Sequence, residues 1–397
     1  MNDDLNVDQL RAEAPGCAVK RFFNHSGASL ASTHTLSAIT SHLQKEALYG
    51  GMEAAAATAP QLAKVRADAE ALLGASPNEV AFTSSASAAI GLAFAALPPL
   101  QPGDRILVGR HEWGGNVSTY QAAAARAGAQ LEVIPSRDSD GSVDAEALER
   151  MIDERVRLVS LTWLPANGGL VNDAAAIGRV TRAAGVPYFV DAGQALGQMP
   201  VDVDTIGCDV LEGTARKFLR GPRGTALLYV RNSFISKLRP VFLDVQSGPW
   251  NDGRVAQRTD ARLFETIESS LALLLGLGSA LEQAQAIGME RIRRRIAVLA
   301  QRLRDALTAI EGVVVQDLGA TKSGIVSFTV QGLEAQVVRE RLAAQHIIVG
   351  ANGVTYTPFD MIARRLPAIV RASVSYLNTE AEIDQLVSAV QLLAANA

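Results

Sequence analysis

The sequence has 397 residues, of which 48% are hydrophobic and 20% are charged, with a formal net charge of −4. This length exceeds what a single core fills, so we expect a large domain and a smaller one. Mild acidity argues against a nucleic-acid surface, and the acidic start Met1–Leu5 gives no reason to expect a signal peptide. The most apolar stretch, Leu271–Leu281, is about half of a ~20-residue membrane span. We therefore expect a cytoplasmic protein that binds neither nucleic acid nor membrane.

The first 230 residues predict an α/β fold. Residues 1–60 suggest one helix near Thr35–Glu46, and short, continuously apolar segments then alternate with Ala-rich helical patterns. Such segments suit a sheet buried on both faces, and the alternation implies that most of its strands are parallel. The predicted helices include Gln61–Leu73, Ser87–Ala96, Thr119–Ala127, Ala145–Ile152 and Ala174–Ala184. The seven predicted strands are Val80–Thr83, Arg105–Val108, Gln130–Ile134, Leu158–Leu164, Pro187–Asp191, Asp209–Glu212 and Thr225–Val230.

The pattern changes beyond about residue 265. A long helical segment, Ile267–Leu307, is followed by short β-branched segments and a terminal helix, Glu380–Leu393. The short segments are Ile325–Val330, Ile347–Val349 and Val370–Val374. This order predicts a smaller α+β domain with an antiparallel sheet. We expect an N-terminal segment (1–20), a large domain (21–265) and a small C-terminal domain (266–397).

The predicted strand Pro187–Asp191 ends in a carboxylic acid. An acid at the end of a buried strand is costly unless it has a partner. Ligands of open parallel sheets bind outside the carboxyl ends of the strands. Asp191 there could pair with a protonated pyridine nitrogen and make that ring an electron sink. Alone, such an Asp more often caps the following turn, so this alternative stays open.

Lys217 follows the next predicted strand, at the end of the segment Thr214-Ala-Arg216-Lys217. A lysine that is desolvated beside an arginine has a lowered pKa and can act as an amine nucleophile. A lone lysine before a Gly-Pro turn is ordinarily an exposed loop residue. The odds change because Asp191 lies one crossover earlier and because a phosphate-binding segment is also present.

That segment is Phe82-Thr-Ser-Ser-Ala-Ser87, which follows a predicted strand and opens a helix. Free backbone N–H groups and small hydroxyls at a helix start suit a phosphate, although they are also ordinary N-caps. The expected phosphate contacts are Ser85, Ala86 and Ser87, with Thr214 as a further hydroxyl. A ring, an amine and a phosphate together indicate pyridoxal 5′-phosphate (PLP).

These motifs resemble those of the class V aminotransferases, which are PLP enzymes of fold type I and include the NifS-like cysteine desulfurases. They occur in the family's order, as Thr83-Ser-Ser-Ala-Ser87, Asp191-x-x-Gln194 and Thr214-x-Arg-Lys217. The segment Arg371–Glu380 matches the family's C-terminal pattern. The resemblance covers roughly residues 20 to 390 and implies a large domain with a seven-stranded, mostly parallel sheet.

The resemblance also implies roles for single residues. Lys217 would hold PLP as a Schiff base, Asp191 would hold the pyridine nitrogen, and Arg371 would bind the substrate α-carboxylate. A guanidinium binds a carboxylate in a bidentate manner, which fixes the Cα–H bond relative to the ring. Gln194 would approach the phenolic oxygen. Trp113 would stack on the ring or pack in the core. The residues expected near the substrate are Ala28, Asn167 and His25, of which His25 could instead be a locally hydrogen-bonded loop residue.

The resemblance leaves the reaction open. Desulfurases carry a nucleophilic Cys in the loop before the strand of Arg371, whereas Val349–Asp360 has none and Cys17 and Cys208 lie elsewhere. These two cysteines match no metal or redox spacing either, so we expect no metal site. Glu112-Trp-Gly-Gly-Asn116 and Phe264–Glu268 resemble the branch that contains hercynylcysteine sulfoxide lyase and isopenicillin N epimerase-like proteins.

We therefore favour a carbon–sulfur β-lyase that converts an S-substituted cysteine, or its sulfoxide, to pyruvate and ammonia. An epimerase or racemase, an aminotransferase and a non-catalytic PLP-binding sensor stay open as alternatives. Fold-type-I enzymes usually build each site at a dimer interface, so the resemblance implies a homodimer with shared active sites. It places Phe264–Ser270 near the partner subunit's cofactor phosphate. Glu268 stands where desulfurases have a Thr, which leaves that contact open.

Overall fold

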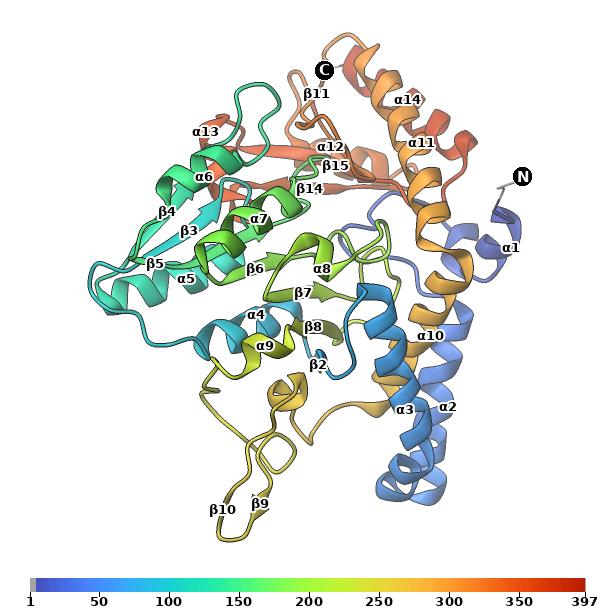
Figure 1. Cartoon of the computed structure of the whole chain (residues 1–397). Helices are drawn as coiled ribbons and strands as arrows, with labels where there is room; N and C mark the ends of the chain where they lie inside the picture. The colour runs from blue at the N-terminus through green and yellow to red at the C-terminus, as the bar shows by residue number, and fades with distance from the viewer. Residues whose placement is uncertain (1–4, 397) are drawn as a thin grey trace.

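The computed structural model describes residues 5–396 and is organised around a seven-stranded sheet (Figure 1). The strand order is β2-β8-β7-β6-β5-β3-β4, and β8 alone runs antiparallel to both of its neighbours. The predicted, mostly parallel sheet is therefore confirmed. Its strands are β2 (Val80–Thr83), β3 (Arg105–Gly109), β4 (Gln130–Ile134), β5 (Val156–Thr162), β6 (Tyr188–Asp191), β7 (Val210–Thr214) and β8 (Ala226–Val230).

Alternate residues of the central strands pack on opposite sides of this sheet, because side chains in a strand alternate between its faces. Phe189 of β6 and Val210 of β7 share one core with Tyr120 of helix α5 (Gly114–Ala127) and with helix α4 (Ala86–Ala95). Val190 and Leu211 share the other core with helix α7 (Ala174–Ala184). Asp191 stands two residues after Phe189, and Glu212 stands two residues after Val210. Their side chains therefore also lie on the side of α4 and α5.

A second, four-stranded antiparallel sheet forms the C-terminal part, as predicted. Its core lies against helices α11, α12 and α14. The strands, in sheet order, are β11 (Val313–Val315), β12 (Ile325–Val330), β15 (Ala368–Ser373) and β14 (Gly350–Gly353). The helices of this part are α11 (Met289–Thr308), α12 (Ala335–Ala343), α13 (Pro358–Ala363) and α14 (Glu380–Ala395).

Two expectations for the C-terminal part were wrong. Ile347–Val349 is not a strand of the antiparallel sheet, because β13 (Ile347–Ile348) pairs in parallel with β1 (Arg21–Phe22). The helical segment Ile267–Leu307 is not continuous: α10 (Leu271–Ile287) ends before Gly288, and α11 begins after it. Gly288 has a φ of 91°, which glycine adopts readily and other residues rarely do.

The apolar helix α10 packs between α2 (Thr33–Tyr49) and α3 (Gly51–Leu73), beside the large sheet (Figure 1). Within residues 5–396, no single helix is long and apolar enough to cross a membrane. Helices α10 and α11 reach the necessary length and apolarity only when taken together, and they are bent by 78° relative to each other.

Because β1 pairs with β13, the start of the chain packs with the C-terminal part. The domain limits at residues 20 and 265 stay predictions. The shorter elements are α1 (Val7–Ala12), α6 (Ala145–Met151), α8 (Val203–Ile206), α9 (Asn232–Ile235), β9 (Trp250–Asn251) and β10 (Arg254–Val255).

Candidate active site

Asp191 is the last residue of β6, and its carboxylate lies on the side of α4 and α5. The backbone N–H of Gly193 donates to Asp191 Oδ1 at 2.8 Å. The side-chain amide of Asn116, in the first turns of α5, reaches Asp191 Oδ2 at 3.4 Å. Both donors favour the charged form of a buried carboxyl group. Asp191 is therefore an oriented carboxylate at the end of the sheet.

Lys217 lies close to Asp191, beyond the end of the neighbouring strand β7. A Cβ at position 193 would lie 2.9 Å from Asp191 Oδ1 and 3.3 Å from Lys217 Nζ, so glycine keeps the space between acid and amine open. Burial lowers the pKa of Lys217 to about 8; Asp191 opposes this shift and Arg216 adds to it. The amine therefore loses its proton far more readily than an exposed lysine does.

The ring of Trp113 covers Lys217, whose Nζ lies 5.9 Å from the ring centre. The ring of Trp113 also contacts the ring of Tyr356, and the two ring centres are 5.5 Å apart. This packing depends on Gly114, because a Cβ there would lie 1.9 Å from the carbonyl oxygen of Thr355. The structure thus places an aromatic ring beside the amine. Whether Trp113 stacks on a cofactor ring stays a prediction.

The predicted phosphate contacts follow strands of the large sheet. One row of residues crosses three neighbouring strands: Thr83 of β2 pairs with Ala226 of β8, which pairs with Thr214 of β7. Thr83 leads into the start of α4, so Thr214 and the start of α4 both adjoin this row. Ser85 caps α4, and its side chain accepts from the N–H of Ala88 at 3.1 Å. The N–H groups of Ala86 and Ser87 lie in the first turn, where a helix has no acceptor for them.

Arg371 projects from β15, the inner strand of the small sheet that pairs with both β12 and β14, and is 6% exposed. Its Nη1 donates to the carbonyl of Ala166 at 2.9 Å and its Nη2 to Asn24 Oδ1 at 3.4 Å. Within the described chain its Nε has no hydrogen-bond partner. Burial lowers the pKa of Arg371 to about 10, partly offset by Tyr356. A buried guanidinium bonded only to neutral oxygens leaves room for a carboxylate.

The segment around Ala28 lies beside the residue that precedes Lys217. The N–H of Ser29 donates to the carbonyl of Arg216 at 2.8 Å, and the Arg216 guanidinium donates to the carbonyl of Gly27. His25 is engaged locally, because Nδ1 lies 2.6 Å from Ser29 Oγ and Nε2 lies 3.0 Å from the carbonyl of Phe22. Burial lowers the pKa of His25 to about 3, so this ring is neutral near pH 7.

Gln194 and Asn167 are both buried, and their side-chain amides differ in which atoms lack a hydrogen-bond partner. Gln194 Nε2 donates to the carbonyl of Ser26 at 3.2 Å, whereas its Oε1 has no partner in the described part of the chain. Asn167 Nδ2 donates at 3.0 Å to both the carbonyl of Gly353 and Thr357 Oγ1. Asn167 therefore ties the segment after β5 to the turn before α13.

Two further buried acids lie at this end of the sheet, and neither was singled out from the sequence. Glu112 accepts from Asn116 at 2.8 Å and from the N–H and hydroxyl of Thr162 at 3.1 Å. Burial raises the pKa of Glu112 to about 7. Glu212 lies inside β7 and is 1% exposed. An acid within an apolar strand is the sequence signal that could have identified Glu212.

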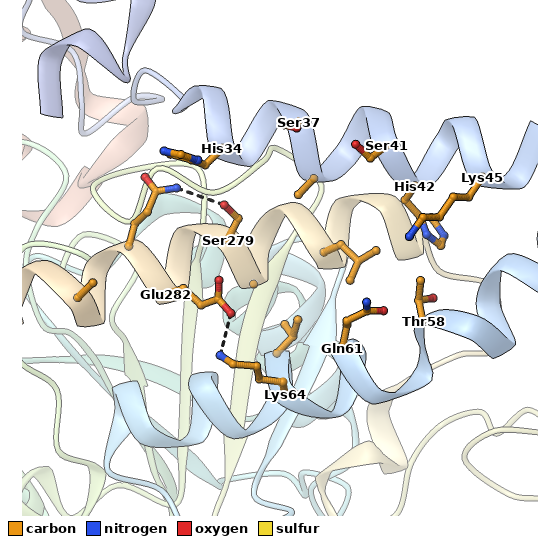
Figure 2. Close-up of a pocket in the computed structure, with 16 residues that line it drawn as sticks. His34, Ser37, Ser41, His42, Lys45, Thr58, Gln61, Lys64, Ser279 and Glu282 are labelled. Carbon is orange, nitrogen blue, oxygen red and sulfur yellow. Dashed lines mark hydrogen bonds and ion pairs between the residues drawn. The ribbon is translucent and has the colours of Figure 1, made fainter. Parts of the chain in front are cut away.

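A groove of about 620 Å³ lies away from this cluster, between α2, α3 and α10 (Figure 2). Lys64 of α3 and Glu282 of α10 form an ion pair of 2.8 Å across it, and buried His42 lines it. It shares no lining residue with the predicted site. In residues 5–396, no group of three or more His, Cys, Asp or Glu side chains could hold a metal ion.

The cluster at the ends of β6 and β7 fits PLP. Asp191 matches a pyridinium nitrogen, Lys217 matches an aldehyde, and the free N–H groups of Ala86 and Ser87 match a phosphate. The buried, unpartnered Gln194 Oε1 and Arg371 Nε show that this region holds polar groups which the chain itself does not satisfy.

The model of the family "Aminotransferase class-V" matches residues 22–386. The chain belongs to this family. As a class V aminotransferase family member it takes PLP as its cofactor. A probable cysteine desulfurase from Xylella fastidiosa is 30% identical over 335 residues, which cover 80% of this chain and 77% of that protein.

Two solved structures extend the similarity over nearly the whole fold. The apo cysteine desulfurase from Thermococcus onnurineus has a TM-score of 0.90 at 23% identity and covers 98% of both chains. The cystine C–S lyase C-DES, solved with its product cysteine persulfide, has a TM-score of 0.84 at 25% identity. It covers 95% of this chain and 99% of that one. The fold-type-I architecture is thus confirmed. The narrower likeness to the sulfoxide lyase and epimerase branch stays a prediction.

Proposed function

We propose that this class V enzyme is a carbon–sulfur β-lyase that acts on an S-substituted cysteine or its sulfoxide. For a thioether substrate, one water is consumed, and the products are a thiol, pyruvate and ammonia. The proposal rests on Asp191 and Lys217 together with Arg371, whose guanidinium is bonded to no carboxylate of the described chain. The loop before the strand of Arg371, Val349–Asp360, contains no cysteine. The similarity to a cystine C–S lyase supports the proposal.

The roles of the residues follow from their contacts. When bound, PLP supplies an electron sink that stabilises negative charge at the substrate Cα. Asp191, held by Gly193 and Asn116, pairs with the pyridine nitrogen. Arg371 binds the substrate α-carboxylate through Nε and Nη2. Fixing the carboxylate turns the Cα–H bond toward one side of the ring.

Lys217 Nζ takes the α-proton as a general base. Its pKa of about 8 suits this role, because a base with a pKa near the working pH is both available and strong enough. The protonated Nζ can then give that proton to the departing sulfur. Trp113 covers the amine and excludes water from this face. Ser85, Ala86, Ser87 and Thr214 hold the phosphate.

The remaining predicted residues act less directly. We assign Asn167 to holding the turn before α13 over the site, since both of its amide hydrogens are used there. His25 holds the segment that carries Ala28, which lines the substrate side. Gln194 approaches the phenolic oxygen of the ring.

The cysteines favour a lyase over a persulfide-forming desulfurase. Cys208 is fully buried, and burial raises the pKa of its thiol far above the usual range. Cys17 packs against the N-terminal helix, and burial raises the pKa of its thiol as well. A nucleophilic cysteine needs a lowered pKa and access to the substrate. Neither thiol meets those conditions.

We also propose that the protein is a homodimer. Phe264–Ser270 leads away from the large sheet, and Ile267 and Glu268 in it are exposed. The segment before it also exposes the apolar side chains of Val241, Phe242 and Val245. Trp250 is exposed as well, in β9 of the projecting β9–β10 hairpin (Figure 1). Exposed apolar side chains of this number in one stretch of chain favour a protein interface.

Uptake of PLP by the cofactor-free protein is expected to accelerate with rising pH and to level off above about 8, the pKa of Lys217. Only the neutral amine attacks an aldehyde, so the rate should fall about tenfold for each pH unit below that value. Stopped-flow absorbance measures this rate. A rate that stays constant between about pH 6 and pH 9 would contradict the assigned pKa and nucleophile.

The reaction itself is tested by incubating the PLP-loaded protein with S-substituted cysteines and with their sulfoxides, and by assaying pyruvate. We expect pyruvate from these substrates and none from alanine, which has no leaving group on Cβ. Exchange of the α-proton in deuterated water without pyruvate would instead favour an epimerase. Formation of a 2-oxo acid together with the aminated cofactor would favour an aminotransferase. Binding without any turnover would favour a sensor.

A further inference from the structure

Glu212 and Asp191 form a buried carboxyl pair at the ends of β7 and β6. The two residues are register partners in the parallel pairing of these strands. Both have the parity that directs side chains to the side of α4 and α5, where Phe189 and Val210 also pack. Register partners lie side by side on one face of a sheet, and both of these side chains are buried. Two carboxyl groups therefore meet directly beside the candidate cofactor ring.

The charges around this pair require one proton to stay on it. Lys217 follows on the chain, Glu112 lies before α5, and Tyr120 of α5, whose hydroxyl lies 3.1 Å from Ser160 Oγ, is on the same side of the sheet. Only the lysine among these groups brings a positive charge. Two adjacent carboxylates cannot both be ionised at low cost in such a buried place, so one of them is neutral.

The hydrogen bonds decide which carboxyl group is neutral. Asp191 accepts from the N–H of Gly193 and from the amide of Asn116, which stabilise its ionised form. Glu212 receives no N–H or O–H donor within residues 5–396, and its Oε2 has no partner at all. A carboxyl group without donors keeps its proton. Burial, together with the neighbouring Asp191, raises the pKa of Glu212 well above its usual value.

We propose that Glu212 is a protonated positioning residue, which donates its hydrogen to Asp191 and so holds that carboxylate ionised and aimed at the pyridine nitrogen. The location of the proton follows from the chain alone. The direction in which Asp191 is aimed rests on the proposed function.

The proton is located by infrared spectroscopy of the cofactor-free protein at about pH 8, where Glu112, with a pKa of about 7, is mostly ionised. We expect the stretching band of a protonated carboxyl group, shifted in deuterated water, and we expect Glu212→Gln to remove it. Native protein without such a band, or a band that survives in Glu212→Gln, would overturn the proposal. This readout requires no cofactor and no activity.

The positioning role is tested by PLP affinity in two variants. Glu212→Gln keeps a neutral N–H donor to Asp191, so we expect an affinity close to the native one. Glu212→Leu removes the donor, and we expect an affinity roughly tenfold or more weaker, the effect of losing one hydrogen bond to a charged group. Thermal unfolding of the cofactor-free variants controls for folding. Equal affinity in all three proteins, or Glu212→Gln as weak as Glu212→Leu, would overturn the role.

The two failures are distinguishable. If the native protein does not bind PLP, the proposed function fails, whereas the infrared result still decides where the proton lies. If PLP binds and turns over normally while the infrared band is absent, only the inference about Glu212 fails.

Discussion

Replacing Lys217 by alanine is expected to lower turnover by at least about 10³-fold and to abolish covalent attachment of PLP. The variant loses the amine that bonds to the cofactor and the base that takes the α-proton. PLP should still bind, but reversibly, because Asp191 and the start of α4 remain. Turnover assays together with the absorbance spectrum before and after gel filtration measure both effects.

Lys20→Ala is the matched control, since Lys20 is an exposed lysine near the N-terminus. It should retain native turnover and native retention of PLP. If Lys217→Ala kept the cofactor through gel filtration as the native protein does, the assignment of Lys217 as the attachment site would be wrong. Thermal unfolding of both variants shows whether a loss reflects chemistry or folding.

Replacing Arg371 by leucine is expected to lower kcat/KM by roughly two to three orders of magnitude while PLP stays bound. The guanidinium is buried, and the hydrogen bonds from its Nη atoms go to a carbonyl and an amide oxygen. The lost partner is therefore the substrate carboxylate. Steady-state kinetics and the cofactor spectrum measure the two quantities separately.

Arg371→Lys should recover only part of the loss, because an ammonium group cannot bind a carboxylate in the bidentate manner. Arg341→Leu, an exposed arginine on α12, serves as the control and should leave the kinetics unchanged. A native kcat/KM in a folded Arg371→Leu protein would remove Arg371 from substrate binding. The carboxylate would then have to bind elsewhere, and Arg216 is the neighbouring candidate.

The large sheet could be predicted because its strands are short, continuously apolar segments, a pattern that suits strands of a sheet buried on both faces. All seven predicted segments overlap strands β2 to β8. The strand β14 could not be predicted in the same way, because Gly350-Ala-Asn-Gly353 lacks the branched and aromatic residues that strands favour. Its place comes from pairing with β15, which is a tertiary contact. The break at Gly288 carried a visible signal, since a glycine inside a helical pattern weakens the helix.

The site was predictable to the extent that its residues stand at strand ends. Asp191 and Lys217 follow consecutive strands, so their proximity is a consequence of parallel topology. The partners of Asn167 could not be foreseen, whereas those of His25 are local, as one of the two alternatives for this residue expected. Asn167 binds residues about 190 positions away, in contacts that only the folded chain brings together. Glu212 was placed within a predicted strand, but its pairing with Asp191 depends on the register between β6 and β7.

The attachment of PLP to Lys217 is tested most directly by reducing the PLP-loaded protein with borohydride, digesting it and locating the cofactor mass on the peptides. Reduction makes the bond between the lysine nitrogen and the cofactor carbon permanent. We predict a single labelled peptide, which contains Lys217. A label on another lysine, or no label on a protein that retains its cofactor, would contradict the assignment on which the proposed mechanism depends.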